Sequence, residues 1–356
     1  MFGKIYFGWG KVNELESLLK ECKVKRAVLV CSKSFKKRCL KLWENIESIS
    51  AVFSDVEPNP QLTNVEAIVK LMREYDADTV IALGGGSSID AAKFAAACAY
   101  SEKEPREHYE GAAFPEKIAK IIAVPTTAGT GSEVTAVSVI SRGGEKKSIH
   151  SPAFAPTACI VDPELTMTVP AKLTMITGID AFTHAIEAYW SVNHSPITDL
   201  FAIESLKLIT KNLERSFTDA DAEARTAMAY GSLLAGLAFA TAKTAASHAC
   251  SFSLSMQHHL PHGEACAFTL DSFIRINADE RLESLARELG FENTDKLADE
   301  IARFKKLAGF KTRLSECDGE IDIDFLAREG SQHMLMKNNP VKLSYDDLKK
   351  MYESLM

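Results

Sequence analysis

The chain has 356 residues, of which 46% are hydrophobic and 25% are charged, and its formal net charge at pH 7 is −7. This length favours two domains over one, and the composition is ordinary for a globular protein. The negative charge gives no electrostatic reason to expect a nucleic acid or an anionic membrane as a partner. Nothing at the start resembles a signal peptide, and no apolar run approaches the roughly 18 residues that span a bilayer. Eight scattered cysteines without a CxxC pair predict free thiols and a cytoplasmic location.

Strand-like and helix-like stretches alternate in the first part of the chain. Strand patterns cover residues 26–31, 51–56, 79–83 and 118–124, and helical spacing covers residues 65–75 and 89–99. Short connections between alternating strands and helices predict a parallel sheet with helices on both faces. After residue 163 few strand signals remain, and long helical patterns follow, for example 198–213 and 222–240. We therefore predict an α/β domain over residues 1–163 and an all-α domain over residues 164–356.

A glycine-rich turn joins the strand pattern of residues 79–83 to the helix that follows. Residues 84–90 have the sequence GGGSSID. Backbone N–H groups at the start of a helix can face an anion, and the missing β-carbons admit a pyrophosphate closely. The turn is not GxGxxG, so the usual dinucleotide fingerprint is not met. The alternative is a tight turn in which Ser87 caps the helix.

A second loop, residues 125–133 with the sequence PTTAGTGSE, follows the strand pattern of residues 118–124. Its hydroxyl groups and two glycines can offer hydrogen-bond donors to phosphate and ribose without bulk. The alternative is a polar loop in which Thr130 or Ser132 caps the next element. Open α/β sheets bind ligands outside the carboxyl ends of their strands. Two such loops at one edge of a sheet therefore favour a nucleotide site.

One carboxylate and three imidazoles in the second half of the chain are candidate metal ligands. Asp180 and His184 are four residues apart, so they lie on one face of a helix. His248 and His262 are fourteen residues apart, and Pro261 indicates that a break separates them. This set of ligand types suits a divalent ion such as Fe(II) or Zn(II).

Each of these residues also has a structural interpretation. A single histidine on a helix is more often packed than ligating, and Asp180 alone would serve as a helix cap after a glycine. Glu187, on the same predicted helix, is expected to support the site rather than to bind the metal directly. The positions of Cys250 and Cys266 suit packing better than ligation.

The two loops and the four candidate ligands occur together and in order, and this set resembles the iron-containing (group III) alcohol dehydrogenase family. The resemblance rests on residues 84–93, 125–133, 178–187 and 261–263. Smaller similarities at residues 7–8, 58–60, 161–165 and 339–340 extend it over almost the whole chain. Each motif alone is weak, whereas together they are highly specific.

The resemblance implies a Rossmann-like dinucleotide-binding domain, a helical metal-binding domain and an active site in the cleft between them. The implied enzyme is an NAD(P)-dependent alcohol dehydrogenase or aldehyde reductase, in which Fe(II) or Zn(II) polarises the substrate oxygen while hydride moves to or from the nicotinamide. The implied metal ligands, through which catalysis proceeds, are Asp180, His184, His248 and His262. The implied cofactor contacts are Asn59, Gly85, Gly86, Ser87, Asp90, Thr126, Thr127, Thr130 and, by position, Lys146.

The chain departs from the family at a position that is often assigned to proton transfer. Many members carry a further histidine four residues after the first ligand of the second pair, where this chain has Phe252. A phenyl ring cannot relay a proton, so water, a ribose hydroxyl of the cofactor or another group must do so. His258 and His259 are candidate replacements, although loop histidines near a metal site more often face solvent.

A second departure concerns the choice of cofactor. Members that prefer NAD tend to place an Asp after the second strand, where it accepts from the ribose 2′-OH and repels a 2′-phosphate. Ser32 takes this place in the chain, and Lys33, Lys36 and Lys37 follow closely. We therefore expect Ser32 to lie beside the ribose and predict NADP(H) over NAD(H). The alternative is that the lysines form a solvated helix face.

Three classes of function follow from these observations. The first is a metal-dependent oxidoreductase that interconverts a small primary alcohol and its aldehyde, with reduction of a small phosphono- or sulfo-aldehyde as a variant. The second is a lyase, because the related dehydroquinate synthase group shares the general fold. The third is a non-catalytic binding protein, against which the intact set of ligands argues. We expect a small-molecule substrate and a homodimer or higher homo-oligomer, without a nucleic-acid or membrane partner.

Overall fold

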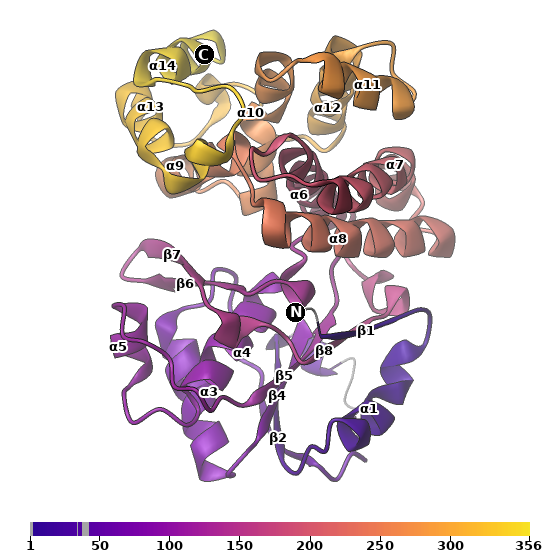
Figure 1. Cartoon of the computed structure of the whole chain (residues 1–356), viewed down its shortest axis with the longest axis vertical. Helices are drawn as coiled ribbons and strands as arrows, with labels where there is room; N and C mark the ends of the chain where they lie inside the picture. The colour runs from indigo at the N-terminus through magenta and orange to yellow at the C-terminus, as the bar shows by residue number, and fades with distance from the viewer. Residues whose placement is uncertain (1–2, 34, 38–42) are drawn as a thin grey trace. The chain divides into compact units, whose positions relative to one another are not determined.

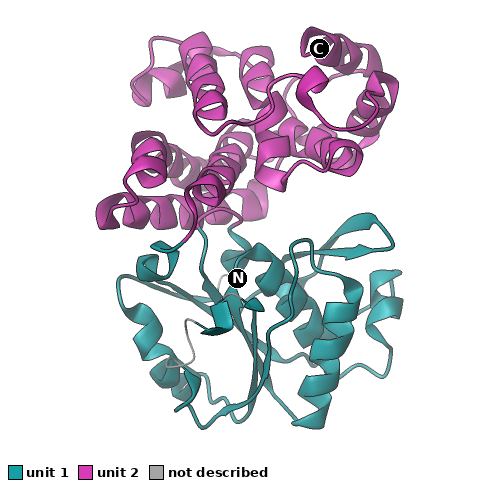
Figure 2. Cartoon of the chain, turned by 180° about the vertical axis from the view of Figure 1, so that it is seen from behind, with its two compact units in different colours: residues 1–127, 131–168 teal, residues 128–130, 169–356 magenta. Residues whose placement is uncertain are grey.

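The structure is a computed structural model that describes residues 3–33, 35–37 and 43–356. The chain forms two compact units (Figure 2), of which unit 1 comprises Met1–Thr127 and Gly131–Thr168, and unit 2 comprises Ala128–Thr130 and Val169–Met356. The sequence places the boundary after residue 163 and gives no signal for the short excursion of residues 128–130 into unit 2. Among the described residues, no helix is long and apolar enough to cross a bilayer.

Unit 1 contains a parallel six-stranded sheet with the strand order β1-β8-β5-β4-β2-β3 (Figure 1). Its strands are β1 (Lys4–Phe7), β2 (Ala27–Cys31), β3 (Ile49–Phe53), β4 (Thr79–Gly84), β5 (Lys120–Pro125) and β8 (Ala158–Val161). The helices of this unit include α1 (Leu15–Glu21), α3 (Leu62–Glu74), α4 (Gly86–Cys98) and α5 (Pro105–Tyr109), with the 3-10 helices η1 (Lys11–Glu14), η2 (Ser132–Val134), η3 (Pro152–Phe154) and η4 (Pro163–Thr166). An antiparallel hairpin of β6 (Val137–Arg142) and β7 (Glu145–His150) completes the unit.

The two faces of the parallel sheet are covered by different helices. Because side chains alternate along a strand, Leu29, Ile81 and Ile122 share one face, where they form a buried cluster with apolar residues of η1 and α1. Helices α3 and α4 pack on the strands from the other face (Figure 1). Strands that are buried on both faces read as continuous apolar runs, which is why β2, β4 and β5 could be predicted from the sequence.

The strand order reverses next to β4, and this is where the sequence predicts a nucleotide site. Strand β3 lies on one side of β2, whereas β4, β5, β8 and β1 continue on the other side. Loops at the carboxyl ends of strands near such a reversal form the ligand-binding edge of open α/β sheets. The segments that begin at Ser32, Gly85 and Thr126 follow β2, β4 and β5 and therefore lie at this edge.

Unit 2 is helical. Its helices are α6 (Ala171–Trp190), α7 (Pro196–Thr218), α8 (Ala222–Ala242), α9 (Ala246–His258), α10 (His262–Ile276), α11 (Glu280–Glu288), α12 (Thr294–Leu307), α13 (Ile323–Gln332) and α14 (Tyr345–Ser354), with the 3-10 helices η5 (Leu314–Glu316) and η6 (Met334–Asn338). Every residue of α6 from Gly178 to Trp190 is buried, so this helix lies inside the unit and its polar residues need internal partners. The predicted fold class, an α/β part followed by an all-α part, is confirmed.

Candidate active site

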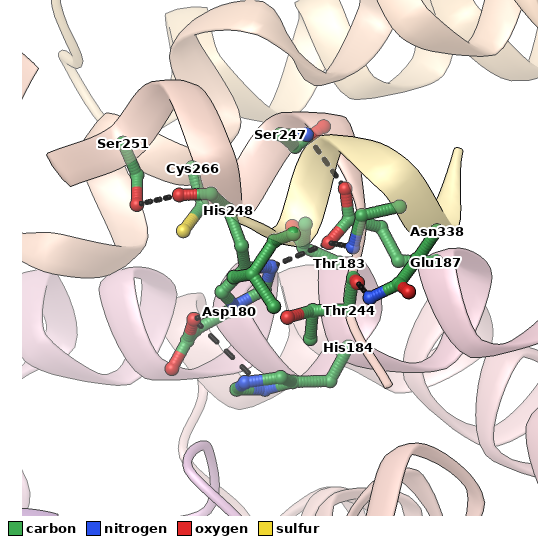
Figure 3. Close-up of polar contacts among 12 residues, drawn as sticks. Asp180, Thr183, His184, Glu187, Thr244, Ser247, His248, Ser251, Cys266 and Asn338 are labelled. Atoms are coloured by element: carbon green, nitrogen blue, oxygen red, sulfur yellow. Dashed lines mark hydrogen bonds and ion pairs between the residues drawn. The ribbon is translucent and has the colours of Figure 1, made fainter. Parts of the chain in front are cut away.

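Three helices of unit 2 bring the predicted metal ligands together, of which Figure 3 shows Asp180, His184 and His248. Asp180 and His184 lie one turn apart in the middle of α6, His248 lies in the first turn of α9, and His262 is the first residue of α10. Because α6 begins at Ala171, the alternative that Asp180 caps a helix is wrong. The turn after α9, in which His259 has a φ of 54°, lets the chain reverse before Pro261 and start α10 beside α9.

The Asp180 carboxylate is the centre of this group. Its Oδ1 atom lies 3.9 Å from His184 Nδ1, 3.7 Å from His248 Nε2 and 3.8 Å from His262 Nε2. Ligands bound tetrahedrally at roughly 2.1 Å lie about 3.4 Å apart. The observed separations exceed that value by a few tenths of an ångström and are too long for direct hydrogen bonds. These distances suit ligand atoms that are bound to the same cation rather than hydrogen-bonded to one another.

Burial makes the polar atoms of the group costly unless a cation binds them. Asp180 Oδ1, His184 Nδ1 and His248 Nε2 are all buried and make no hydrogen bond among the described residues. A buried polar atom without a partner costs about 1–3 kcal/mol. Three such atoms converge on one point, which fits a metal ion that would satisfy all of them.

The charge states also fit a cation. Burial acts to raise the pKa of the Asp180 carboxyl, but the surrounding imidazoles, led by His184, outweigh it and lower the pKa well below its usual range. Burial lowers the pKa of His184 to about 4, only partly opposed by Asp180. At neutral pH Asp180 is therefore ionised and His184 is neutral, which are the forms that bind metals. Cys266 and Glu187 outweigh the effect of burial and raise the pKa of His248 well above its usual range, so this imidazole would lose a proton on binding a metal.

Glu187 fixes the orientation of His248. It is fully buried one turn beyond His184, and its Oε2 accepts a hydrogen bond from His248 Nδ1 at 2.6 Å. The same carboxylate accepts from the backbone N–H groups of Ala245 and Ser247 at 2.9 and 2.6 Å (Figure 3). These bonds satisfy donors at the start of α9, which has no side-chain cap of its own. The bond to His248 Nδ1 also directs Nε2 of the same ring toward Asp180. Carboxylates that do not bind a metal themselves orient metal-binding histidines in this way.

Glycine at position 263 is required by a close approach of two backbones. A β-carbon on Gly263 would lie 2.0 Å from the carbonyl oxygen of Ile176 in α6. Only a residue without a β-carbon lets the start of α10 come this near to α6. The adjacent His262 consequently reaches the Asp180 carboxylate from the opposite helix.

Of the two cysteines near the histidine pair, the structure brings only Cys266 to the site. Asp180, His248, His262 and Cys266 each place one ligand atom within 4.8 Å of the others. Cys266 follows His262 by one turn of α10, and its Sγ lies 3.8 Å from His262 Nε2. The helical register thus turns the Cys266 side chain toward the candidate ligands, and the expectation that Cys250 and Cys266 pack rather than bind the metal stays a prediction.

His258, a candidate for proton transfer, lies far from the candidate metal ligands, whereas Phe252 lies beside them. His258 ends α9 and is buried, with its Nδ1 bonded to the Asp318 carbonyl oxygen. Ten residues of helix separate it from His248, or about 15 Å along the axis. The ring of Phe252 stacks instead on His333, at 4.7 Å between centroids, and its edge meets His262 at 6.3 Å. The sequence gives no signal for His333, because it lies between α13 and η6, far along the chain.

In unit 1, the glycine turn after β4 leaves the start of α4 open. Gly85 is the N-cap of α4, and no side chain caps this helix, so the alternative in which Ser87 is the cap is wrong. A β-carbon on Gly85 would lie 3.3 Å from Thr127 Oγ1, and Thr126 N–H donates to the Gly84 carbonyl oxygen at 3.0 Å. Gly85, Gly86 and Ser87 therefore lie beside Thr126 and Thr127, and unsatisfied N–H groups at this helix start suit a phosphate.

The Asp90 side chain on α4 connects the glycine turn after β4 to the second loop and to β6. Its carboxylate accepts from Ser132 Oγ at 2.6 Å and from the Val139 N–H at 3.0 Å. The fully buried Lys93 ammonium donates to Ser132 Oγ at 2.8 Å, and burial lowers its pKa to about 8. Gly131, not Ser132 or Thr130, is the N-cap of the short helix η2. Both Asp90 oxygens thus have partners in the protein, which suits a role in holding the loop rather than the cofactor.

The remaining predicted cofactor residues lie in different elements of the chain. Ser32 directly follows β2, Asn59 lies in an exposed loop with a φ of 55°, and Lys146 lies in β7. Burial raises the pKa of Asp90, and the charges of Lys93 and Lys146 only partly oppose this rise. Lys33 forms an exposed ion pair with Asp55 at 3.2 Å. Thr130 belongs to unit 2.

Fold and site together define a class of protein. One unit is an open α/β sheet with a phosphate-sized turn at its reversal point, and the other is a helical unit that gathers a carboxylate and three imidazoles. This combination is that of a nucleotide- and metal-dependent oxidoreductase.

Comparison with known proteins identifies the family. The model of the family described as "Iron-containing alcohol dehydrogenase" matches residues 3–163, and the model described as "Fe-containing alcohol dehydrogenase family, C-terminal" matches residues 174–356. The chain therefore belongs to the iron-containing alcohol dehydrogenase family, and it is an NAD(P)-dependent oxidoreductase of this type. The family and the enzyme class predicted from the sequence are confirmed.

Three similar proteins illustrate the range of the family. Long-chain-alcohol dehydrogenase 1 of Geobacillus thermodenitrificans is 34% identical over 98% of this chain and 94% of its own. The NADPH-dependent butanol dehydrogenase of Clostridium saccharobutylicum is 33% identical over 98% of this chain and 95% of its own. The crystal structure of sulfoacetaldehyde reductase from Bifidobacterium kashiwanohense in complex with NAD+ has a TM-score of 0.94 and 40% identity, and covers 99% of this chain and 96% of that one.

Proposed function

We propose that this enzyme interconverts a small primary alcohol and its aldehyde by hydride transfer with NAD(P)(H), using a divalent metal ion held by Asp180, His184, His248 and His262. The observation that carries this proposal is the convergence of three buried ligand atoms that have no partner among the described residues. A carboxylate with imidazoles suits Fe(II) or Zn(II). When bound, such an ion supplies a Lewis acid that polarises the substrate oxygen.

The residues of the chain have separate tasks in this proposal. Asp180 contributes the negative charge that a cation needs. Glu187 keeps His248 in one tautomer by accepting a hydrogen bond from its Nδ1–H group. Phe252, stacked on His333 and facing His262, presents an apolar ring that excludes water from this side of the ligands. In unit 1, the open start of α4 at Gly85 binds the pyrophosphate of the cofactor.

We propose the remaining cofactor contacts because most of them lie in the segments that follow β2, β4 and β5 at the carboxyl ends of these strands, whereas Asn59 and Lys146 are proposed from their positions in the family pattern alone. They are Asn59, Gly86, Ser87, Asp90, Thr126, Thr127, Lys146 and Ser32, together with Thr130 from the short excursion into unit 2. For Asp90 we propose an indirect role, since its carboxylate holds the second loop through Ser132.

The proposal is tested by restoring metals to stripped enzyme. We expect stripped protein to oxidise neither NADPH nor NADH in the presence of short-chain aldehydes, and Fe(II), Zn(II) or Mn(II) to restore turnover to different extents. Turnover would be followed by the loss of nicotinamide absorbance. Undiminished activity after complete removal of metal would contradict the proposed role of the four ligands.

A second candidate substrate class is a small acidic aldehyde. The observation in its favour is the similarity to a sulfoacetaldehyde reductase at 40% identity over nearly the whole chain. Phosphono- and sulfo-aldehydes should therefore be included in the same assay. A kcat/KM at least tenfold higher for sulfoacetaldehyde than for an uncharged aldehyde of equal length would select this candidate, and the reverse ratio would reject it.

Replacement of Glu187 by glutamine is expected to weaken the metal site without removing a ligand. The amide keeps the shape but loses the charge that orients the His248 ring and accepts its proton. We expect metal affinity to fall by about 10–100-fold, the usual effect of losing an outer carboxylate. Competition with a chromophoric chelator measures this change, and an unchanged Kd would show that Glu187 serves only to start α9.

We further propose that NADP(H) is preferred over NAD(H). Ser32, directly after β2, brings no carboxylate to repel a 2′-phosphate. Lys36 lies near this end of β2, since its charge partly opposes the burial that raises the pKa of Cys31, the last residue of the strand, to about 11. The Asp55 carboxylate that pairs with Lys33 opposes this preference, although exposed ion pairs contribute little.

Replacement of Ser32 by aspartate is expected to shift the preference toward NADH. A carboxylate there would accept from a ribose 2′-OH and repel a 2′-phosphate. The measurement is the ratio of kcat/KM for NADPH to that for NADH, which should fall by at least about tenfold, the equivalent of 1.4 kcal/mol. An unchanged ratio would place Ser32 away from the ribose.

We also propose that the enzyme is a homo-oligomer of a reducing cytoplasm. Val192, Ile197 and Leu200 are 56%, 68% and 70% exposed within nine residues of unit 2, and a group of exposed apolar side chains is typical of an interface. The seven cysteines among the described residues are all free thiols, as in reducing compartments. Analytical ultracentrifugation of the full chain tests the oligomeric state.

A further inference from the structure

Lys243 has a backbone conformation that is almost exclusive to glycine. It directly follows α8 and has a φ of 68° and a ψ of 164°. A β-carbon makes this conformation unfavourable, and residues that are nevertheless held in it cluster at ligand-binding and catalytic sites. A glycine would adopt the same backbone without strain. The presence of a lysine here therefore has to be explained by what its side chain does.

The segment that follows Lys243 is fixed by two side chains from other parts of unit 2. Asn338 Nδ2 donates to the Thr244 carbonyl oxygen at 2.8 Å (Figure 3). Ala245 N–H donates to the Glu187 carboxylate at 2.9 Å. The strained backbone is thus tied, two residues later, to the carboxylate that also orients one of the candidate metal ligands.

The last turn of α8 brings Lys243 close to the candidate metal ligands from a second direction. Lys243 N–H donates to the Phe239 carbonyl oxygen at 2.9 Å. The ring of Phe239 stacks on His184, with 4.2 Å between the ring centroids. Lys243 therefore lies between two segments that both contact the site, the end of α8 and the start of α9.

The Lys243 ammonium has no anionic partner among the described residues. Its side chain is half-buried, and Nζ donates to the Ala240 carbonyl oxygen at 3.0 Å. Burial lowers the pKa of Lys243, and no neighbouring charge opposes this effect. An ammonium carries three donors, so two remain after the bond to Ala240. A bound oxyanion would use these donors and would offset the cost of burying the charge.

Capping of α8 does not explain the lysine. Lysine side chains often donate to the last carbonyl groups of a helix, as Lys243 does to Ala240. A lysine in the last turn of the helix itself could do the same with ordinary helical backbone angles. The cap therefore does not require a lysine at the one position where the backbone favours glycine.

We propose that Lys243 binds the anionic end of an acidic aldehyde, a sulfonate or phosphonate group, while the carbonyl end of the same substrate lies at the candidate metal ligands. Lys243 is then a specificity-determining residue for the second substrate class named above, and this inference rests on the proposed function. The flexible four-carbon stem of lysine lets the ammonium turn from the Ala240 carbonyl oxygen to an oxyanion. The exchange favours binding, because hydrogen bonds between two charged groups are stronger than those to a neutral carbonyl oxygen.

The test compares sulfoacetaldehyde with propanal, an uncharged aldehyde of similar length, in the full-length enzyme loaded with Fe(II) or Zn(II). Lys243→Met keeps most of the length of the side chain but removes its charge. We expect it to lower kcat/KM for sulfoacetaldehyde by at least about tenfold, mainly through KM, with a much smaller change for propanal. The Kd of ethanesulfonate, an unreactive anion, should rise by a similar factor in calorimetric titration. Lys243→Arg should retain most of the preference for the acidic aldehyde.

Two further variants separate the charge from its surroundings. Lys243→Gly removes the charge together with the backbone strain, so it should lose the same preference while the midpoint of thermal unfolding rises. It also provides a folded variant if Lys243→Met does not fold. Lys207→Met is the matched control, because it removes an exposed lysine of unit 2 that pairs with Glu288 at 2.8 Å. This control should leave kcat/KM for both aldehydes unchanged.

The possible outcomes distinguish this inference from the proposed function. An equal loss with both aldehydes, or no loss with either, would overturn the role of Lys243 and leave the proposed function intact. A rise in KM for NADPH with both aldehydes would assign the lysine to a phosphate of the cofactor and would overturn its role in substrate binding. Failure of the unmodified, metal-loaded enzyme to reduce any aldehyde would overturn both.

Discussion

Replacement of Asp180 by asparagine is expected to abolish metal binding and turnover together. The amide preserves the shape of the side chain but removes the charge that faces all three imidazoles at 3.7–3.9 Å. The loss should exceed the roughly 10–100-fold effect of removing an outer carboxylate, because a direct ligand is lost. Metal content per chain, measured by plasma mass spectrometry after dialysis, should fall in parallel with kcat.

Asp199→Asn provides a control with similar chemistry. Asp199 also lies beside a histidine, with its Oδ2 3.1 Å from His194 Nδ1, but this pair is at the start of α7. We expect this variant to keep its metal and its turnover. His262→Ala should resemble Asp180→Asn, with metal occupancy and turnover lowered together. A fully active Asp180→Asn enzyme without metal would contradict the assignment of the site.

Replacement of Gly263 by alanine is expected to destabilise unit 2 and to displace His262. The new β-carbon would lie 2.0 Å from the Ile176 carbonyl oxygen, so the start of α10 must move away from α6. Overpacking of this kind costs about 1–3 kcal/mol, and we expect the upper end because the obstacle is backbone. Chemical denaturation measures the free energy of unfolding, and metal titration measures the accompanying loss of affinity.

Gly309→Ala separates crowding from backbone conformation. Gly309 has a φ of 65°, and a β-carbon there would meet no atom within 4 Å. Alanine should therefore cost only the roughly 1–2 kcal/mol of a left-handed residue and should leave metal affinity unchanged. Equal metal affinity in the Gly263→Ala and unmodified proteins would show that the close approach of α10 to α6 is not needed to place His262.

The elements that could be predicted from the sequence are those with strong local patterns. β2, β4 and β5 are continuous apolar runs, and α7 and α8 are long amphipathic or apolar helices. The hairpin of β6 and β7 was missed because its strands are polar and half-buried. The spacing of Asp180 and His184 predicts a helix but not its start at Ala171, because an interior helix has no clear polar face.

The candidate site could be predicted as far as spacing along one helix allows. Asp180 and His184 are one turn apart, so their proximity follows from the helix itself. That Cys266 lies near Asp180 and His248 depends on the point at which α10 begins, and that His333 stacks on Phe252 depends on the packing of segments distant in sequence. Neither relation is encoded locally. The family resemblance implies a cofactor contact for Asp90, whereas the sequence does not show that Ser132 and Val139 occupy its oxygens.

The Glu187 carboxylate has a consequence for how the enzyme tolerates sequence change. It holds the first amides of α9 and the ring of His248 with the same two oxygens. Fraying of the first turn of α9 would therefore release the imidazole as well, so that loading with metal and the order of this turn are thermodynamically linked. Substitutions at Ala245 or Ser247, which are not proposed ligands, would then change how much metal the enzyme retains. Variation in the segment that precedes a ligand is thus a means by which relatives can retune metal affinity while their ligands stay the same.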